Sequence, residues 1–260
     1  MLQTVPEDNQ NQVELDHFAG KLINSDLKSH LKFVEDRPHK VVRVATPDPL
    51  EDETIGTVIR KHLQTIPYFT ELQEAYGIAV PEIKLATGAV DHKNALLVET
   101  DMIYGDNLHH KTFTDEERPL ARKELEHLCE SLSHYLTAKY ESGEPFLSDL
   151  VGLGQFVYGR KNGEVTDRVY LVDLHPRTAI FDKEHPGSTG NLQFVTNLQS
   201  QYHIISELEQ RCGGAPFIKA RAGLRSLIEK VPPDIPLPML LSSARQGLGI
   251  PTHEMQPAAA

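Results

Sequence analysis

The sequence predicts an α+β fold in two parts, a small lobe built on an antiparallel sheet and a mainly helical C-terminal lobe. Short β-branched segments dominate the first hundred residues, whereas long segments with helical periodicity dominate the remainder. One strand–turn–strand pattern near residue 160 interrupts the helical part. With 260 residues, 39% of them hydrophobic, the chain can bury a core of this size.

The first strands are expected in a hairpin. Residues 31–34 and 40–44 have strand composition, and the turn-forming residues 35–38 separate them. The two ends of the chain are polar or rich in alanine and proline. We therefore expect a disordered N-terminus over residues 1–12 and a flexible tail over residues 251–260.

Helical spacing of apolar residues follows over residues 55–63. Pro67 is expected to end this helix, because proline removes a backbone donor and collides with the preceding turn. A second, short helix is expected to run up to Gly77, which can adopt the left-handed conformation of a helix end. Strand composition returns at residues 80–85 and 95–100.

A long helix is expected in the second half of the chain. Thr114 and Glu117 have the spacing of a capping box, and Gly143 is a candidate stop after a helix that runs to about Tyr140. The apolar stripe of this helix consists of Leu125, Leu128, Leu132, Tyr135 and Leu136.

A second hairpin and two more helices are expected after it. Residues 155–159 and 168–173 read as the two strands of the hairpin, with a turn between them. Residues 192–212 and 217–230 have helical character.

Composition excludes several classes of protein. The formal charge of −11 is incompatible with a broad basic surface for nucleic acid. Cys129 and Cys212 are the only cysteines, too few for a disulfide framework or a cysteine-rich zinc module. No stretch of about eighteen apolar residues occurs, so we expect no membrane span and a cytoplasmic protein.

Asp149 and Asp173 are the most informative polar residues. They lie just before the second hairpin and at the end of its last strand, where two carboxylates can meet at one site. Magnesium-assisted phosphoryl transfer needs one carboxylate to orient a hydroxyl and another to hold the metal. The alternative is that both residues only cap turns, a common use of aspartate.

The order of these motifs resembles the protein-kinase-like fold. Residues 95–108 resemble the strand and hinge between two lobes, residues 145–149 (Pro-Phe-Leu-Ser-Asp) resemble a catalytic loop, and residues 40–44 resemble the strand that carries a phosphate-binding lysine. The string Leu-Val-Asp-Leu-His at residues 171–175 is closer to small-molecule and lipopolysaccharide-sugar kinases than to protein kinases.

This resemblance implies both an organisation and a function. A small sheet-rich lobe is expected over residues 13–99, a hinge over residues 100–108, and a helical lobe over residues 109–250 that contains the β-hairpin 155–174. The implied activity is an ATP- and magnesium-dependent phosphotransferase acting on a hydroxyl of a small-molecule or protein acceptor.

The resemblance also implies roles for individual residues. Asp149 would orient the acceptor hydroxyl, and Asp173 with Gln155 would hold Mg²⁺. A cation on the small-lobe strand would neutralise phosphate. An acidic residue of the following helix would hold that cation in place, and a second acidic residue would lie on the strand before the hinge. The candidates are Lys40 or Arg43 for the cation, Glu53, Glu71 or Glu74 for the helix acid, and Glu99 for the hinge strand.

The sequence departs from the family at several of these positions. Gly20 is the only glycine between Val13 and Arg43, where a glycine-rich phosphate loop belongs, and the strand places arginine where lysine is usual. Gly154 stands where the family has a metal-binding asparagine, so Gln155 would serve only after a shift of one residue. These departures leave an alternative open, a catalytically inactive kinase-like module that binds a protein partner.

A third hypothesis is a metal-dependent hydrolase. It would use some of the thirteen histidines together with Asp91, Asp149 or Asp173. His127 and His134 share one helix face, but that face lies opposite the apolar stripe and is expected to be a solvated polar surface. If the chain binds a protein partner, its charge of −11 favours a neutral or basic partner surface.

Overall fold

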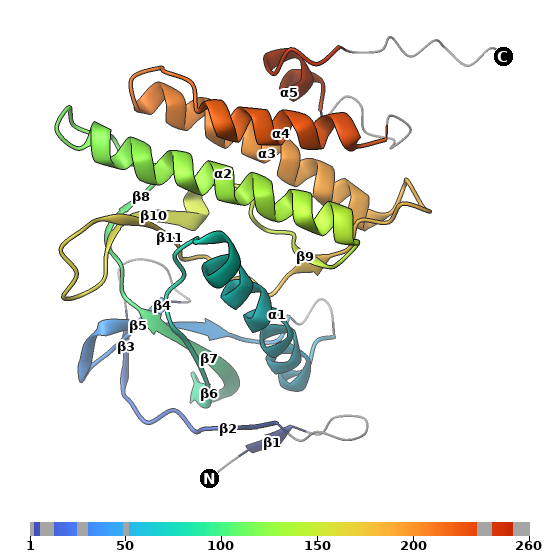
Figure 1. Ribbon diagram of the computed structural model, residues 1–260. Helices are drawn as coiled ribbons and strands as arrows, with labels where there is room; N and C mark the ends of the chain where they lie inside the picture. The colour runs from blue at the N-terminus through green and yellow to red at the C-terminus, as the bar shows by residue number, and fades with distance from the viewer. Residues whose placement is uncertain (1–2, 6–12, 25–30, 49–51, 233–240, 252–260) are drawn as a thin grey trace.

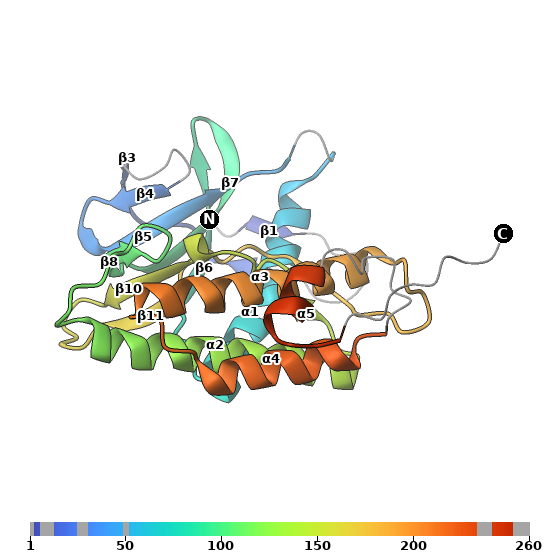
Figure 2. The same ribbon diagram turned by 90° about the horizontal axis from the view of Figure 1, so that it is seen from above.

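The computed structural model describes residues 3–5, 13–24, 31–48, 52–232 and 241–251. It confirms a mixed α+β fold whose sheets pair their strands in antiparallel fashion. In Figure 1 a sheet-rich region lies below a stack of long helices, and helix α1 lies between them. The view from above in Figure 2 shows the long helices side by side.

A five-stranded sheet forms the first region. The predicted first hairpin is confirmed, because residues 31–34 pair with the strand that follows a tight turn. In spatial order the strands are β3 (Leu22–Asn24), β4 (Leu31–Val34), β5 (Arg37–Ala45), β7 (Lys93–Asp101) and β6 (Ile83–Val90).

The expectation of disorder over residues 1–12 falls mostly on residues 1–2 and 6–12, which lie outside the described ranges, as does nearly all of the expected tail over residues 251–260. Residues Gln3–Val5 form strand β1, which pairs antiparallel with β2 (Val13–Leu15) in a separate two-stranded sheet. The pairing with β2 provides hydrogen-bond partners for the backbone groups of β1. Beyond β2, the chain follows β6, where Phe18 N donates to Thr87 O at 2.9 Å.

Helix α1 (Ile55–Tyr76) runs through Pro67 without ending there, which corrects the predicted break into two helices. Thr54 caps its first turn by accepting a hydrogen bond from Thr57 N, and Gly77 ends it at φ 69° as predicted. The helix is buried on both sides of the proline, at Val58 and at Leu72 among others. This packing offsets the one hydrogen bond that proline removes.

The two faces of the five-stranded sheet are covered differently. One face packs Leu96 and Val98 against Val58 and Ile59 of α1. On the opposite face Val42 and Leu97 belong to a smaller cluster of buried side chains. Period-two alternation therefore decides which strand residues face α1.

The predicted hinge over residues 100–108 is mostly strand. Strand β7 continues to Asp101, and residues Tyr104–Asn107 form β8, which leaves only Met102 and Ile103 between the two strands. Met102 N donates to His39 O at 2.8 Å, so this link is also tied to the sheet.

Strand β8 pairs with the predicted second hairpin to form a three-stranded sheet in the order β11-β10-β8. The hairpin consists of β10 (Phe156–Arg160) and β11 (Arg168–Leu171), preceded by the short 3₁₀ helix η1 (Leu153–Gln155). A bridge between Ala79 and Tyr170 connects the segment after α1 to β11.

The long helices enclose the main core of the molecule. The capping box is confirmed, because Thr114 and Glu117 exchange hydrogen bonds of 2.9 and 3.3 Å, and Gly143 ends the first helix at φ 70°. No helix in the described ranges is both long enough and apolar enough to span a bilayer. The helices are α2 (Arg118–Ser142), α3 (Thr189–Arg211), α4 (Ile218–Lys230) and the short α5 (Ser242–Gly247).

Candidate functional site

The segments that carry Asp149 and Asp173 lie side by side. Strand β9 (Phe146–Leu147) pairs antiparallel with β12 (Thr178–Ala179), and the next residue, Ser148, donates its backbone N–H to Arg177 O at 3.1 Å. Asp149 directly follows this contact, and Asp173 lies near the start of the strand-free segment between β11 and β12 that leads to it. The two carboxylates predicted to cooperate therefore belong to neighbouring segments.

Helix α3 contacts the Asp149 segment through a hydrogen bond. The buried side chain of Asn197 donates from Nδ2 to Ser148 O at 3.1 Å and to Gln193 O on its own helix at 3.1 Å. A fully buried amide that bonds to the residue before Asp149 fixes the backbone on which that carboxylate stands.

An ion pair joins the sheet to the Asp173 segment. Arg43 of β5 places Nη2 2.6 Å from Asp173 Oδ1, and both side chains are mostly shielded from solvent. His175 Nε2 lies 3.2 Å from the same carboxylate oxygen and 3.5 Å from Arg43 Nη1. Asp173 therefore already has a cationic neighbour from the five-stranded sheet.

The backbone of Gln155 contacts the backbone of Asp173. Its backbone carbonyl accepts from Val172 N at 2.9 Å and from Asp173 N at 3.4 Å. Its side-chain Oε1 is buried and has no hydrogen-bond partner among the described residues. A buried carbonyl oxygen without a donor is costly unless something else occupies it.

The side chains of Asp173 and Gln155 carry the types of oxygen that a hard divalent cation prefers. Mg²⁺ prefers carboxylate and amide oxygens, and Asp173 with the unpartnered Gln155 Oε1 offers both types. The contact with Arg43 competes for Asp173, since one carboxylate oxygen already lies beside a guanidinium. Within the described ranges no group of three or more His, Cys, Asp or Glu side chains is placed to hold a metal.

The two candidate cations of β5 face opposite sides of the sheet. Lys40 lies opposite Asp101 of β7 and pairs with it at 2.7 Å, and Lys161 lies 3.7 Å from the other oxygen of Asp101. Arg43 lies opposite Val98, on the α1 side. The structure thus brings Arg43, and not Lys40, to Asp173.

Glu99 does not join Arg43. It lies opposite Val42, on the sheet face turned away from α1, and its buried carboxylate pairs with Arg37 Nη1 at 2.6 Å. Arg37 also lies over the ring of Phe18, 5.2 Å from its centroid. This acid therefore has a partner within its own face of the sheet.

The three glutamates that were candidates to hold Arg43 either pair with other cations or are exposed. Glu53 precedes α1, and Glu71 and Glu74 lie on it. Glu53 pairs with Lys61 at 2.7 Å near the start of the helix. Glu71 pairs at 2.8 Å with the buried Lys139 of α2, and Glu74 is exposed. The acid expected to hold Arg43 is replaced in that role by Asp173 itself.

His62 is a residue of this region that the sequence did not single out. It is buried on α1, and its Nδ1 lies 2.9 Å from Val58 O. Burial lowers the pKa of His62, and the charges of Arg43 and His175 lower it further, while the bond to Val58 acts in the opposite direction. The signal in the sequence that could have indicated its burial is its helical spacing from Ile55, Val58 and Ile59, which places it on the same apolar face.

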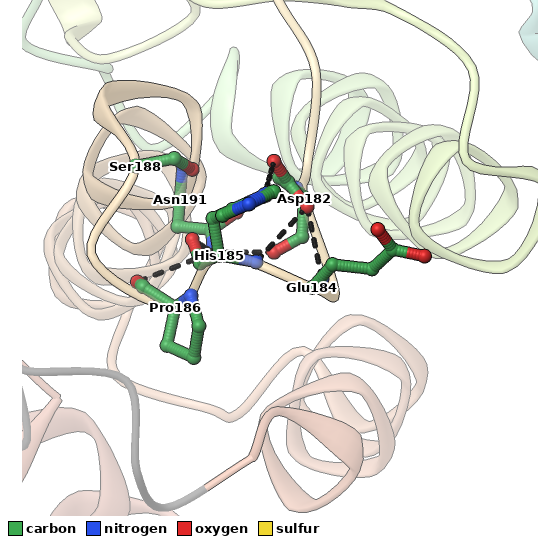
Figure 3. A network of polar contacts seen from close by, with 6 residues as sticks. All are labelled: Asp182, Glu184, His185, Pro186, Ser188 and Asn191. Atoms are coloured by element: carbon green, nitrogen blue, oxygen red, sulfur yellow. Dashed lines mark hydrogen bonds and ion pairs between the residues drawn. The ribbon is translucent and has the colours of Figure 1, made fainter.

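The chain beyond β12 is fixed to the start of α3 by a buried amide, as Figure 3 shows. Asn191 is fully buried, and its Oδ1 accepts from Asp182 N at 2.7 Å. Its Nδ2 donates to three carbonyls, those of Asp182, His185 and Pro186, at 2.7 to 3.2 Å. The loop that follows the candidate site is therefore an ordered part of the helical region.

The carboxylate of Asp182 organises the same loop. It accepts from the backbone N–H groups of Glu184 and His185, and His185 Nδ1 lies 2.8 Å from it (Figure 3). The bond to the His185 side chain, with those to the backbone, holds the pKa of Asp182 below its usual range. Ser188 then caps α3 by accepting from Asn191 N at 3.3 Å.

A cavity of about 430 Å³ lies on the other side of the sheet from Arg43. Leu97, Lys32 and Gly88 are among its lining residues, and Lys32 lies opposite Val42 on the face turned away from α1. This cavity is separate from the Arg43–Asp173 contact. The candidate site is therefore defined by Arg43, Asp149 and Asp173 and not by this cavity.

Comparisons with known proteins give a distant structural similarity. No family model matches the sequence, and no curated protein matches it. Among solved structures, the chain is similar to one described as the microcompartment-associated aminopropanol kinase, with a TM-score of 0.40 and 14% identity. That alignment covers 85% of this chain and 80% of the other. A likeness this loose leaves the function to be inferred from the residues of this chain.

Proposed function

We propose that the protein is a divergent kinase-like phosphotransferase that transfers the γ-phosphoryl group of ATP to a hydroxyl acceptor. The contact that carries this proposal is the 2.6 Å ion pair between Arg43 of the sheet and Asp173, beside the segment of Asp149. It brings a phosphate-binding type of cation and two carboxylate-bearing segments to one place. Phosphoryl transfer depends mainly on such positioning and charge.

The order of elements supports a two-lobed, kinase-like arrangement. The five-stranded sheet with α1 comes first, then the short link at Met102 and Ile103, then α2, the Asp149 segment and the hairpin that leads to Asp173. A nucleotide would lie between the sheet and the helical region, on the sheet face that carries Arg43.

That face offers apolar surface for a base. Phe33 and Val41 lie opposite each other on β4 and β5, and Val41 shares a face with Arg43 two residues further on. Both apolar side chains are only partly buried. A purine ring that covered them would remove apolar area from water.

Each residue has a defined role in this proposal. Asp149 would accept or orient the proton of the acceptor hydroxyl, and Arg43 would exchange its contact with Asp173 for the phosphate oxygens. Asp173 and Gln155 would hold Mg²⁺, which supplies charge neutralisation on the phosphates when bound. His62 and His175 would remain beside the guanidinium and limit where it can move.

The first test is thermal unfolding with and without Mg²⁺ and ATP, followed by an ATP-turnover assay. A ligand at a hundred times its Kd stabilises the folded state by about 2.7 kcal/mol. We expect stabilisation of the wild type, loss of it in Arg43→Gln, and loss of both stabilisation and turnover in Asp173→Asn. Lys84→Gln, an exposed β6 residue paired with Glu82, is the control and should behave as the wild type.

Retained turnover in a correctly folded Asp173→Asn variant would overturn the proposal. Circular dichroism of each variant without ligand separates loss of binding from loss of folding. Withholding Mg²⁺ from the wild type should reduce the stabilisation if Asp173 and Gln155 bind the metal.

A second candidate function is a catalytically inactive kinase-like module that binds a protein. The observation that favours it is the same ion pair, because Arg43 already neutralises Asp173 without any ligand. The stretch between β3 and β4, residues 25–30, also has no glycine for a phosphate loop, although it lies outside the described residues. Absence of any stabilisation at millimolar Mg²⁺ and ATP would favour this function over catalysis.

A further inference from the structure

A second cavity, of about 530 Å³, lies between the segment after β8 and the C-terminal end of α3. It contains none of the candidate site residues Arg43, Asp149 and Asp173 in its lining. The residues that line it are His109, His110, Lys111, Thr112, Phe113, Arg118, Gln210 and Arg211.

The lining is cationic although the chain as a whole carries a charge of −11. Lys111, Arg118 and Arg211 contribute three fixed positive charges, two exposed histidines add further donors, and no lining residue is acidic. The acids that pair with these cations, Asp106, Asp115, Glu117 and Glu207, lie outside the lining, so the hydrogen-bond donors of the cavity, and not its net charge, favour a ligand rich in acceptors.

Arg211 makes this wall rigid. As the last residue of α3, it donates from Nη1 to Leu108 O and Lys111 O and from Nη2 to His109 O, and it pairs with Glu207 one turn earlier. Three carbonyls on one guanidinium fix the path of the chain around the cavity.

Lys111 is held at the cavity as a cation. Its Nζ lies 2.9 Å from Glu117 Oε1 and 3.2 Å from Asp106 Oδ2. Burial lowers the pKa of Lys111, but these two hydrogen bonds outweigh burial and the pKa is raised overall. An ammonium group has three donors, and the two carboxylates use two of them.

Arg118 has a buried donor without a partner. Its Nη1 pairs with Asp115, whereas its Nε is buried and has no hydrogen-bond partner among the described residues. An unpaired charged N–H is unfavourable, so a ligand oxygen that reached Nε after a shift of this 43%-exposed side chain would satisfy it.

We propose that this cavity binds a small organic molecule that carries a phosphate group, with Arg118 and Lys111 as the cations that recognise it. A phosphate offers several acceptor oxygens and two negative charges, which matches several converging donors better than a single carboxylate does. The volume lies in the range of about 300 to 1,000 Å³ that is common for small-molecule sites. This inference is independent of the proposed phosphotransferase activity.

The test uses inorganic pyrophosphate as the probe, titrated into the full chain by calorimetry and by ¹H–¹⁵N NMR of arginine Nε–H groups. The ionic strength is kept at about 10 mM, where the Debye length is about 30 Å and charge attraction is weakly screened. We expect the Nε–H signal of Arg118 to shift on binding, and Arg118→Gln to weaken binding about tenfold or more.

Arg225→Gln is the matched control. Arg225 is a helical arginine of similar exposure, 49% against 43% for Arg118, and each pairs with an acid close to it in sequence. Arg43→Gln reports binding at the candidate active site instead. Arg225→Gln and Arg43→Gln should both leave the affinity of this cavity unchanged.

Two results would overturn the proposal. One is the absence of any binding at millimolar pyrophosphate, and the other is equal affinity of the wild type and Arg118→Gln. If Arg118→Gln fails to fold, the NMR shift of the wild-type Arg118 signal decides, because a probe bound elsewhere would leave it in place.

Discussion

The protonation of His62, a buried residue near the candidate site, is coupled to folding. Burial lowers its pKa below the ordinary value of 6.5, so the folded state favours the neutral ring. Below the ordinary pKa the unfolded chain binds a proton that the folded chain resists, and stability falls as the pH falls. Above it both states are neutral, and His62 contributes no pH dependence.

We predict that His62→Gln flattens the pH dependence of stability on the acid side of pH 6.5. The slope that it removes is at most about 1.4 kcal/mol per pH unit, the limit for one proton. Urea unfolding at a series of pH values measures it. His134→Gln, at an exposed position of α2, is the control and should keep the wild-type slope.

The period of a strand accounts for the faces of the two cations of β5 but not for their partners. It places Lys40 and Arg43, three positions apart, on opposite faces. It did not identify which acid each would meet. Asp101 and Asp173 became those partners because the sheet and the hairpin pack as they do.

At the scale of elements, the junction of α1 and α2 is held by a buried charge. Lys139 of α2 is only 4% exposed, pairs with Glu71 at 2.8 Å and Glu144 at 3.1 Å, and lies over the rings of Tyr68 and Tyr135. Removing an acid that neutralises a buried ammonium leaves an uncompensated charge in the core. Replacing the ammonium-bearing side chain itself by an apolar one leaves no such charge on the buried side and costs less.

We predict an order of destabilisation at this junction. Glu71→Gln should lower the free energy of unfolding by about 1 to 3 kcal/mol, because the ammonium of Lys139 stays buried with one acid fewer. Lys139→Met should cost less, since the methionine packs between the rings and the partly exposed Glu71 can be hydrated. Denaturant unfolding gives the comparison.

Glu144→Gln is the control for that series. Glu144 is 63% exposed, so its loss should change stability by no more than about 0.5 kcal/mol. A larger loss for Lys139→Met than for Glu71→Gln would contradict the account of a buried charge that needs its acid.

Pro67 shows the limit of local rules for an element. Proline predicts a helix end, and α1 nevertheless continues through it for nine more residues to Tyr76. The buried residues Phe69 and Leu72 on the far side pack into the main core. Contacts with distant parts of the chain thus decided the length of the helix.

At the scale of the whole molecule, the Arg43–Asp173 pair is a polar tie between the five-stranded sheet and the helical region. We predict a coupling free energy of about 1 kcal/mol in a double-mutant cycle of Arg43→Gln and Asp173→Asn, because both side chains are mostly shielded. Denaturant unfolding of the two single variants and the double variant measures it.

A matched cycle on an exposed pair provides the comparison. Lys21 and Glu35 lie 2.8 Å apart within the sheet region, at 71% and 54% exposure. Their coupling should be smaller than that of Arg43 and Asp173. Strictly additive effects of the Arg43 and Asp173 substitutions would show that the pair does not tie the two regions.

The sequence by itself determined the features that depend on nearby residues. The α+β class, the two hairpins, the capping box of Thr114 and Glu117 and the helix ends at Gly77 and Gly143 all follow from local backbone preferences and hydrogen bonds. The face that each β5 side chain occupies follows from the period of a strand.

Only the tertiary structure decided which of these groups meet. The contact of Arg43 with Asp173 spans 130 positions of sequence, and those of Glu71 with Lys139 and of Arg211 with Leu108 also cross between distant elements. Such partners depend on how whole elements pack, and spacing along the chain carries no record of that packing. The candidate site and the cationic cavity are products of this packing.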